Sequence, residues 1–280
     1  MPDANGSHFT EAQGIVLAND SVARLRASGL SVPLLGPVPE GPHFFYEDGP
    51  ELFLRRRGRG ALHVTWDTNL LIDYFQFGGA LWRGDSLADL IPNEHGLELE
   101  ALQLIVSLWV LRDIRFHISP QVIVDSKRGN LSGLRSKQRE RAWQEFCLAI
   151  ALVGDDDDFR GETLILPASE LERALKVVPA GNDRNLVGDA VRNRMHVFLT
   201  RDAHVLRAAE ALRPFGLRIE SPQELLEVLA ASGAFHCMMA ARHLYWPMPD
   251  QQRVYHLLKA LPDETTNPDF EPVPRESSGH

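Results

Sequence analysis

The sequence has few cysteines, few lysines and no long apolar segment, and each shortage excludes a class of protein. Its two cysteines, Cys147 and Cys237, are too few for a disulfide framework and are not spaced as a zinc site. No uninterrupted apolar run reaches the ~18 residues that a membrane-spanning helix needs. The first thirty residues also lack the basic start, apolar centre and cleavage site of a secretory signal peptide. We therefore expect a cytoplasmic protein.

Several sequence motifs of common enzyme classes are also missing. There is no GxxxxGK(S/T) loop to hold a nucleotide, no GxSxG nucleophile elbow and no HExxH motif, and the eleven histidines show no paired spacing. A formal net charge of -9 argues against a protein that coats nucleic acid by bulk electrostatics. The charge leaves open an enzyme that acts on nucleic acid through a local basic rim. The 280 residues, 44% of them hydrophobic, are enough to form a substantial core.

From Ala61 onward, short apolar runs alternate with longer segments of helical periodicity, which is typical of βαβ folds. The predicted strands are 62–66, 115–118, 163–166, 197–200 and 217–219, and the predicted helices are 98–112, 139–152, 184–194, 203–212 and 222–231. Ser119 and Ser221 each precede a proline, which is the pattern of an N-cap followed by the first helical residue. Strands separated by helices imply an α/β fold with a parallel sheet and right-handed crossovers.

The alternating pattern covers 61–231, and the flanking segments differ from it in composition. Residues 1–60 form an N-terminal extension that is dense in proline and glycine over 31–50, so we expect it to be partly irregular. Residues 232–261 predict a helical extension, either packed back on the domain or serving as a surface for a partner. The Pro-rich, acidic segment 262–280 predicts a disordered tail.

Four aspartates fall where the predicted strands end or where the next helix begins. Asp67 and Asp202 each close a strand, Asp125 lies about two helical turns after a strand, and Asp183 begins the helix that leads to the fourth strand. The functional crevice of a parallel sheet lies beyond the carboxyl ends of its strands. We therefore expect these four carboxylates to converge on one edge of the sheet.

Carboxylates brought together without a basic partner repel each other, and a divalent cation relieves that repulsion. Mg²⁺ and Mn²⁺ prefer carboxylate and water oxygens and complete their coordination with substrate phosphate. The pattern therefore favours metal-assisted phosphodiester chemistry over zinc hydrolysis. The alternative for each aspartate is a purely structural role, since an aspartate at a junction between a strand and a helix is often only an N-cap.

Five segments, in this order, resemble motifs of the PIN-domain nucleases: WDTNLLIDY at 66–74, ISPQVIVD at 118–125, NDRNL at 182–186, FLTRD at 198–202 and SPQELL at 221–226. The family usually has Glu where this chain has Asp125, and the gap between the first two acids is longer than in the family. The resemblance covers about 61–231, and the flanking segments do not match.

The resemblance implies a three-layer α/β/α sandwich with a mainly parallel central sheet and an endoribonuclease that depends on Mg²⁺ or Mn²⁺. The residues that it implies for catalysis and metal binding are Asp67, Asp125, Asp183 and Asp202. The products would carry 5′-phosphate and 3′-hydroxyl ends. A bacterial toxin or defence ribonuclease controlled by a regulatory protein partner is the role that the resemblance favours. RNA processing and homo-oligomerisation are both compatible with it.

Other residues near the four aspartates have weaker patterns. Asp189 competes with Asp183 for the third position, but six residues along a helix do not return to the same face. Asp73 follows Asp67 by the same six residues, and we predict that it lies on the helix surface or contacts the residues of the site from behind. Thr68, Asn69 and Thr200 are the candidate supporting residues, with helix capping as the alternative for each.

A basic segment, 126–141, begins directly after Asp125 and holds six basic residues against a single acid. We expect it to bind the phosphates of RNA, and a solvated loop and helix face is the alternative. Its candidate substrate-binding residues are Lys127, Arg128, Arg135 and Lys137. The acidic run 155–158 predicts only a solvated loop. Arg55, Arg56, Arg57 and Arg59 precede the first strand and are expected at the opposite edge.

Two other functions are compatible with parts of the sequence. The Asp125 departure and the long extensions favour, as an alternative, a catalytically weak PIN-like domain that binds RNA or a protein partner. A phosphatase with Asp67 as nucleophile would need a second aspartate two residues later, where this chain has Asn69.

Overall fold

We analysed a computed structural model of the chain. The residues that it describes are 44–45, 59–60, 62–83, 86–91, 93–111, 114–122, 143–144, 146–148, 150–152 and 168–231. The predicted strand 163–166, the acidic run 155–158, the basic segment 126–141 and everything after 231 lie outside these residues.

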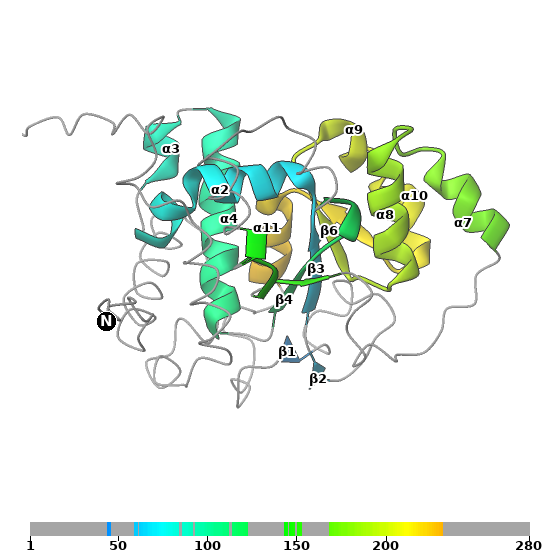
Figure 1. Cartoon of the computed structure of the whole chain (residues 1–280), viewed down its shortest axis with the longest axis horizontal. Coiled ribbons are helices and arrows are strands. Elements are labelled where there is room, and N and C mark those ends of the chain that lie inside the picture. The colour runs from blue at the N-terminus through cyan, green and yellow to red at the C-terminus, as the bar shows by residue number, and fades with distance from the viewer. Residues whose placement is uncertain are drawn as a thin grey trace, which may run out of the picture.

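The centre of the fold is a parallel sheet, as the alternating sequence pattern predicts (Figure 1). Its strands are β3 (Leu62–Trp66), β4 (Ile114–Ile118), β5 (Ala151–Leu152), β6 (Val197–Leu199) and β7 (Arg218–Glu220). They lie in the order β5-β4-β3-β6-β7, and every neighbouring pair is parallel. The chain therefore leaves β3 toward one edge of the sheet and returns to its other side as β6. In open parallel sheets such a reversal forms a crevice at the carboxyl ends of the two strands, so we expect the binding crevice between β3 and β6.

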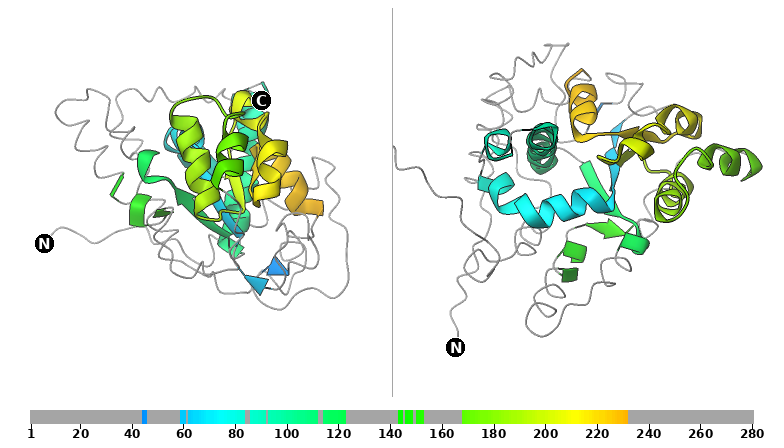
Figure 2. Two further views of the ribbon diagram at one scale, coloured as in Figure 1. Left: turned by 90° about the vertical axis from the view of Figure 1, so that its right-hand side faces the viewer. Right: turned by 90° about the horizontal axis from the view of Figure 1, so that it is seen from above.

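Helices cover both faces of the sheet, so the fold is an α/β/α sandwich (Figure 2). The helices on one side are α2 (Thr68–Arg83), α3 (Leu87–Leu90), α4 (Glu94–Leu111) and α11 (Pro222–Ala231). The helices on the other side are α7 (Ala168–Leu175), α8 (Asn182–Arg192), α9 (Ala203–Leu206) and α10 (Ala209–Leu212). In the part of the chain that the structure describes, no helix is long and apolar enough to cross a membrane.

The face toward α2 is an aromatic core. Alternate residues of β3, ending with Trp66, are directed to this side, and the Trp66 ring lies 4.9 Å from the ring of Phe116 and 5.8 Å from that of Tyr74. Phe146 lies 6.4 Å from Trp66 and 5.9 Å from Tyr74, measured between ring centroids. Burial of these large rings supplies much of the free energy that fixes α2 on the sheet. The first residue after β3 is therefore held in a defined position.

The opposite face of the sheet carries buried histidines beneath α8. Nδ1 of His63 in β3 and Nε2 of His117 in β4 lie 2.8 Å apart, and the backbone N–H of His63 donates to Nδ1 of His196 at 3.0 Å. All three side chains are buried. Because neighbouring strands bring these histidines together, their irregular spacing in the sequence gave no sign of the contact. Two hydrogen bonds therefore connect the three histidines across neighbouring strands.

Most predicted element boundaries agree with the structure to within a few residues. The predicted helix over 139–152 is wrong at its end, because Ala151 and Leu152 pair with β4 as a short strand. The predicted helix over 203–212 is interrupted and becomes α9 and α10. Ahead of the sheet, β1 (Phe44–Phe45) and β2 (Arg59–Gly60) form an antiparallel pair that the sequence analysis did not predict.

Candidate active site at the β3–β6 crevice

Asp67 lies at the junction between β3 and α2 and is only 6% exposed. Its backbone N–H donates to the carbonyl oxygen of Leu199 at 3.0 Å, which ties the junction to β6. Its carbonyl oxygen accepts from the N–H of Leu71 and so begins α2. The side chain also acts locally, because Oδ1 accepts from the N–H of Thr68 at 2.6 Å. This oxygen thus bonds to the first N–H of α2, and not to the second or third N–H that an N-cap side chain usually contacts.

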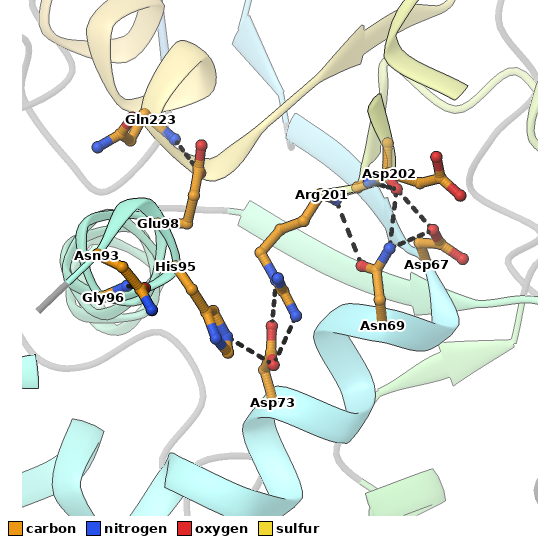
Figure 3. A network of polar contacts seen from close by, with 11 residues as sticks. Asp67, Asn69, Asp73, Asn93, His95, Gly96, Glu98, Arg201, Asp202 and Gln223 are labelled. Atoms are coloured by element: carbon orange, nitrogen blue, oxygen red, sulfur yellow. Dashed lines mark hydrogen bonds and ion pairs between the residues drawn. The ribbon is translucent and has the colours of Figure 1, made fainter. Parts of the chain in front are cut away.

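The second oxygen of Asp67 is held by side chains from two elements (Figure 3). Oδ2 accepts from Nδ2 of Asn69 at 2.8 Å and from Oγ1 of Thr200 at 2.6 Å. Oγ1 of Thr200 in turn accepts from Nδ2 of Asn69 at 3.1 Å and from the backbone N–H of Asp202 at 3.0 Å. The structure thus brings two of the predicted supporting residues, Asn69 and Thr200, against Asp67. Thr68 contacts the carboxylate through its backbone N–H.

Asp202 and Asp183 reach the same crevice from α9 and α8. Asp202 is the N-cap of α9, and its Oδ1 accepts from the N–H of His204 at 2.7 Å. Asp183 lies in the first turn of α8, which follows Gly181 with a φ of 111°, a backbone conformation that favours glycine. Three of the four predicted carboxylates therefore come from three separate elements to one edge of the sheet.

The charges of Asp183 and Asp202 act on the Asp67 carboxyl, and the charge of Asp202 acts on that of Asp183. Burial raises the pKa of the Asp67 carboxyl above its ordinary value, and the charges of Asp183 and Asp202 raise it further. The hydrogen bonds from Thr200 and Thr68 oppose this by stabilising the charged form. The pKa of Asp183 is also raised, first by burial and then by the charge of Asp202. Asp67 and Asp183 therefore ionise less readily than a free aspartate does.

The donor set has the chemistry of a site for a hard divalent cation. Its three candidate ligands are carboxylates, whose oxygens Mg²⁺ and Mn²⁺ prefer. Within the described ranges, the Asp67 carboxylate accepts only from neutral donors and contacts no arginine, lysine or histidine side chain. In the same ranges, however, no three His, Cys, Asp or Glu side chains are arranged as a metal-binding group. The residue types fit such a cation, and the described residues by themselves do not form a metal-binding group.

Asp189, the competitor of Asp183, is engaged elsewhere. Its Oδ2 accepts from Oγ of Ser119 at 3.1 Å, and its Oδ1 lies 3.2 Å from Nη1 of Arg192. It is not among the charges that shift the pKa of Asp67, whereas Asp183 is. This difference favours Asp183 as the third acid. Oγ of Ser119 also accepts from the N–H of Gln121 at 3.2 Å, as the predicted cap requires.

Asp73 does not lie on the helix surface, and that part of its predicted placement is wrong. Its side chain is 3% exposed, and it binds the guanidinium of Arg201 through two contacts, Nε to Oδ2 at 2.5 Å and Nη2 to Oδ1 at 2.9 Å. Nε2 of His95 lies 3.1 Å from Oδ1 of the same carboxylate (Figure 3). The sequence analysis assigned no role to Arg201 or His95. A usable signal was the four-residue step from Asn69 to Asp73, which places both on one face of α2.

The remaining predicted site residues lie outside the described residues. These are Asp125, Lys127, Arg128, Arg135 and Lys137. The fourth predicted acid and the predicted phosphate-binding residues therefore stay predictions.

No family model, no curated protein and no solved structure matches this chain. The case for its function consequently depends on the geometry and chemistry of the crevice.

Proposed function

We propose that this protein is a metal-dependent endoribonuclease of the PIN-domain type, with Mg²⁺ or Mn²⁺ bound by Asp67, Asp183 and Asp202. The observation that carries the proposal is the buried Asp67 carboxylate, which lies beside two further carboxylates and has no cationic side chain in contact among the described residues. A buried carboxylate in such a cluster is costly to ionise, and a functional role is the physical reason to keep it.

The chain's own residues would orient the reactive groups. Asn69 and Thr200 hold Oδ2 of Asp67. The hydrogen bond that the N–H of Asp202 donates to Oγ1 of Thr200 keeps Asp202 beside Asp67. A bound divalent cation supplies activation of a water molecule and neutralisation of charge on the phosphodiester. Asp125 is proposed as the fourth acid. Lys127, Arg128, Arg135 and Lys137 are proposed to contact the RNA backbone.

The biological setting belongs to the same proposal. A toxin or defence ribonuclease in the cytoplasm, controlled by a protein partner, is compatible with this chemistry, and so are RNA processing and a homo-oligomeric assembly. None of these roles changes the reaction at the crevice.

A binding module without catalysis is the second candidate function. The observation that favours it is that both oxygens of Asp67 already accept hydrogen bonds, while no metal-binding group of three side chains occurs among the described residues. In that case the crevice would recognise RNA or a protein partner, and the acidic residues would serve only as caps.

Cleavage of a mixed pool of structured and unstructured RNAs distinguishes the two functions. Wild type, Asp67→Asn and Asp202→Asn would be compared in Mg²⁺, in Mn²⁺ and in EDTA. Glu210→Gln, at an exposed position in α10, is the matched control for removal of one negative charge. We expect cutting by wild type and the control alone, loss of cutting in EDTA, and 5′-phosphate ends on the products. Tight RNA binding with no cutting would favour the binding module, and equal cutting by all four proteins would indicate a contaminating nuclease.

The same assay tests the assignment of the third acid. Asp183→Asn is expected to lose cleavage, whereas Asp189→Asn is expected to retain it because Asp189 is bonded to Ser119 and Arg192 instead of the cluster. Loss of cleavage in the Asp189 variant alone would exchange the two assignments.

A further inference from the structure

The loop that carries Asp202 is held by two residues of α2 that are one helical turn apart. Asn69 bonds to Oγ1 of Thr200 at 3.1 Å and accepts from the backbone N–H of Arg201 at 3.4 Å. Asp73, four residues further along α2, binds the side chain of Arg201. One face of α2 therefore fixes both the backbone and a side chain of the loop that connects β6 to α9.

The contact between Arg201 and Asp73 is the stronger of these two attachments. The two nearly parallel N–H···O bonds, of 2.5 and 2.9 Å, form a charge-assisted bidentate pair. The Asp73 side chain is 3% exposed and that of Arg201 is 25% exposed, so solvent screens the pair only weakly. The side chain of Arg201, the residue directly before Asp202, is thus turned toward α2.

His95 supports the same carboxylate from α4. Its Nε2 lies 3.1 Å from Oδ1 of Asp73, and Glu98, on the same helix, accepts from the N–H of Gln223 at 3.0 Å at the start of α11 (Figure 3). The position of Asp73 is therefore fixed by α2 and by a helix that is itself attached to α11. The Arg201 side chain binds to a rigid partner.

We propose that Arg201 is a positioning residue of the acidic cluster. Its pair with Asp73 holds Thr200 and Asp202 against Asp67, so that the affinity of the cluster for a divalent cation depends on a guanidinium that is not a ligand. This inference depends on the proposed metal-dependent function. Substitution of residues that orient metal ligands costs about 10- to 100-fold in metal affinity in well-studied sites.

The ion pair between Arg218 and Glu220 provides a matched control on the same sheet. Both residues are in β7, their side chains are 7% and 13% exposed, and Nε of Arg218 donates to Oε1 of Glu220 at 2.7 Å. Glu220 is not among the groups that shift the pKa of Asp67 or of Asp183. Glu220 meets the Asp202 loop through its backbone carbonyl oxygen, which accepts from the N–H of Thr200 at 3.0 Å, and Arg218→Met removes a buried side chain while leaving this backbone bond in place.

The test measures Mn²⁺ binding directly, from the electron paramagnetic resonance signal of free Mn²⁺ titrated with the full-length chain. Wild type, Arg201→Met, Arg201→Lys and Arg218→Met are compared, and a thermal melt of each variant fixes a temperature at which all four are folded. We expect Arg201→Met to weaken Mn²⁺ binding by about tenfold or more. Arg201→Lys should recover part of the loss, because lysine keeps the charge without the bidentate fork. The Mn²⁺ affinity of Arg218→Met should stay within about twofold of wild type, even if its melting temperature falls as far as that of Arg201→Met.

The outcomes separate this inference from the function on which it depends. If Arg201→Met binds Mn²⁺ as tightly as wild type, or if Arg218→Met loses as much Mn²⁺ affinity as Arg201→Met, the positioning role is overturned and the metal site stands. Absence of Mn²⁺ binding by the wild type would overturn the metal site and the positioning role together. Cleavage assays on the same four proteins provide a second readout, in which a weakened site should need a higher Mn²⁺ concentration for half-maximal activity.

Discussion

Asp67 and Asp73 are six residues apart at the start of the same helical segment, and both are buried, yet their surroundings are opposite. Asp73 binds the guanidinium of Arg201 and lies beside His95. Asp67 accepts bonds from neutral donors, and the charges nearest to it are those of Asp183 and Asp202. One carboxylate is neutralised by the fold, and the other is surrounded by charge of its own sign.

This difference is the physical reason for proposing a structural role for Asp73 and a functional role for Asp67. A buried acid that stabilises a fold is supplied with positive charge by its own chain. A buried acid that is kept against like charges lowers stability, and it is retained where function needs it. Four substitutions can test this contrast.

Asp73→Asn is expected to lower the free energy of unfolding by about 3–5 kcal/mol, because it leaves the Arg201 guanidinium partly buried without its counterion. Urea denaturation at pH 7 in EDTA measures the change. The double variant Asp73→Asn/Arg201→Met should lose less than the sum of the two single losses, because the uncompensated charge is gone. A loss below about 1 kcal/mol in Asp73→Asn would contradict the structural role of this carboxylate.

Asp67→Asn is expected to become more stable relative to wild type as the pH rises. The raised pKa means that folded Asp67 binds its proton more tightly than unfolded Asp67 does. The resulting destabilisation of wild type is absent below the unfolded pKa, grows as the pH rises through the interval between the two pKa values, and is complete above the folded pKa. Urea denaturation of both proteins in EDTA, from pH 3 to pH 7, should show the difference in free energy of unfolding shifting steadily in favour of the variant. A difference that is independent of pH would show that Asp67 is not electrostatically strained.

His95→Gln is expected to lower the free energy of unfolding by about 0.5–1 kcal/mol. The effect is smaller than that of Asp73→Asn because the His95 side chain is 30% exposed and Arg201 remains to neutralise the carboxylate. Thermal melts at pH 6 and pH 8 measure the loss. A cost equal to that of Asp73→Asn would mean that His95, and not Arg201, is the main partner of this carboxylate.

Arg192→Gln is expected to change the free energy of unfolding by less than about 0.5 kcal/mol. Its ion pair with Asp189 joins side chains that are 58% and 36% exposed, so water screens the interaction. The same denaturation series provides the measurement and sets the baseline for a surface pair. A loss comparable to that of Asp73→Asn would remove the contrast between buried and exposed pairs.

The sequence predicted the positions that follow from local patterning. The strand 62–66 and the helix 222–231 agree with the structure residue for residue, and the parallel-sheet rule brought Asp67 and Asp202 to one edge. Asn69 and Thr200 were predicted as supporting residues, and they contact Asp67 directly. These predictions succeeded because each depends on residues close in sequence together with one rule of topology.

The contacts that the sequence did not predict are between residues far apart in the chain. Arg201 and Asp73 are separated by 128 positions, and their contact depends on how α2 crosses the end of β6. The two-residue strand β5 is too short to show an alternating pattern. The helix predicted from the preceding periodicity was therefore extended to residue 152. The histidine contacts require strand register, which one sequence alone does not specify.

The buried histidines have a consequence for how the crevice is assembled. A central parallel strand is buried on both faces and is therefore commonly apolar throughout, which leaves its alignment with its neighbours weakly defined. In β3, His63 and Thr65 face one side of the sheet, whereas Leu62, Val64 and Trp66 face the other. A slip of one residue would turn Trp66 toward α8 and His63 into the aromatic core, and both changes are strongly unfavourable. The polar stripe thereby sets the alignment of β3 with β6, and with it the height at which Asp67 meets Thr200.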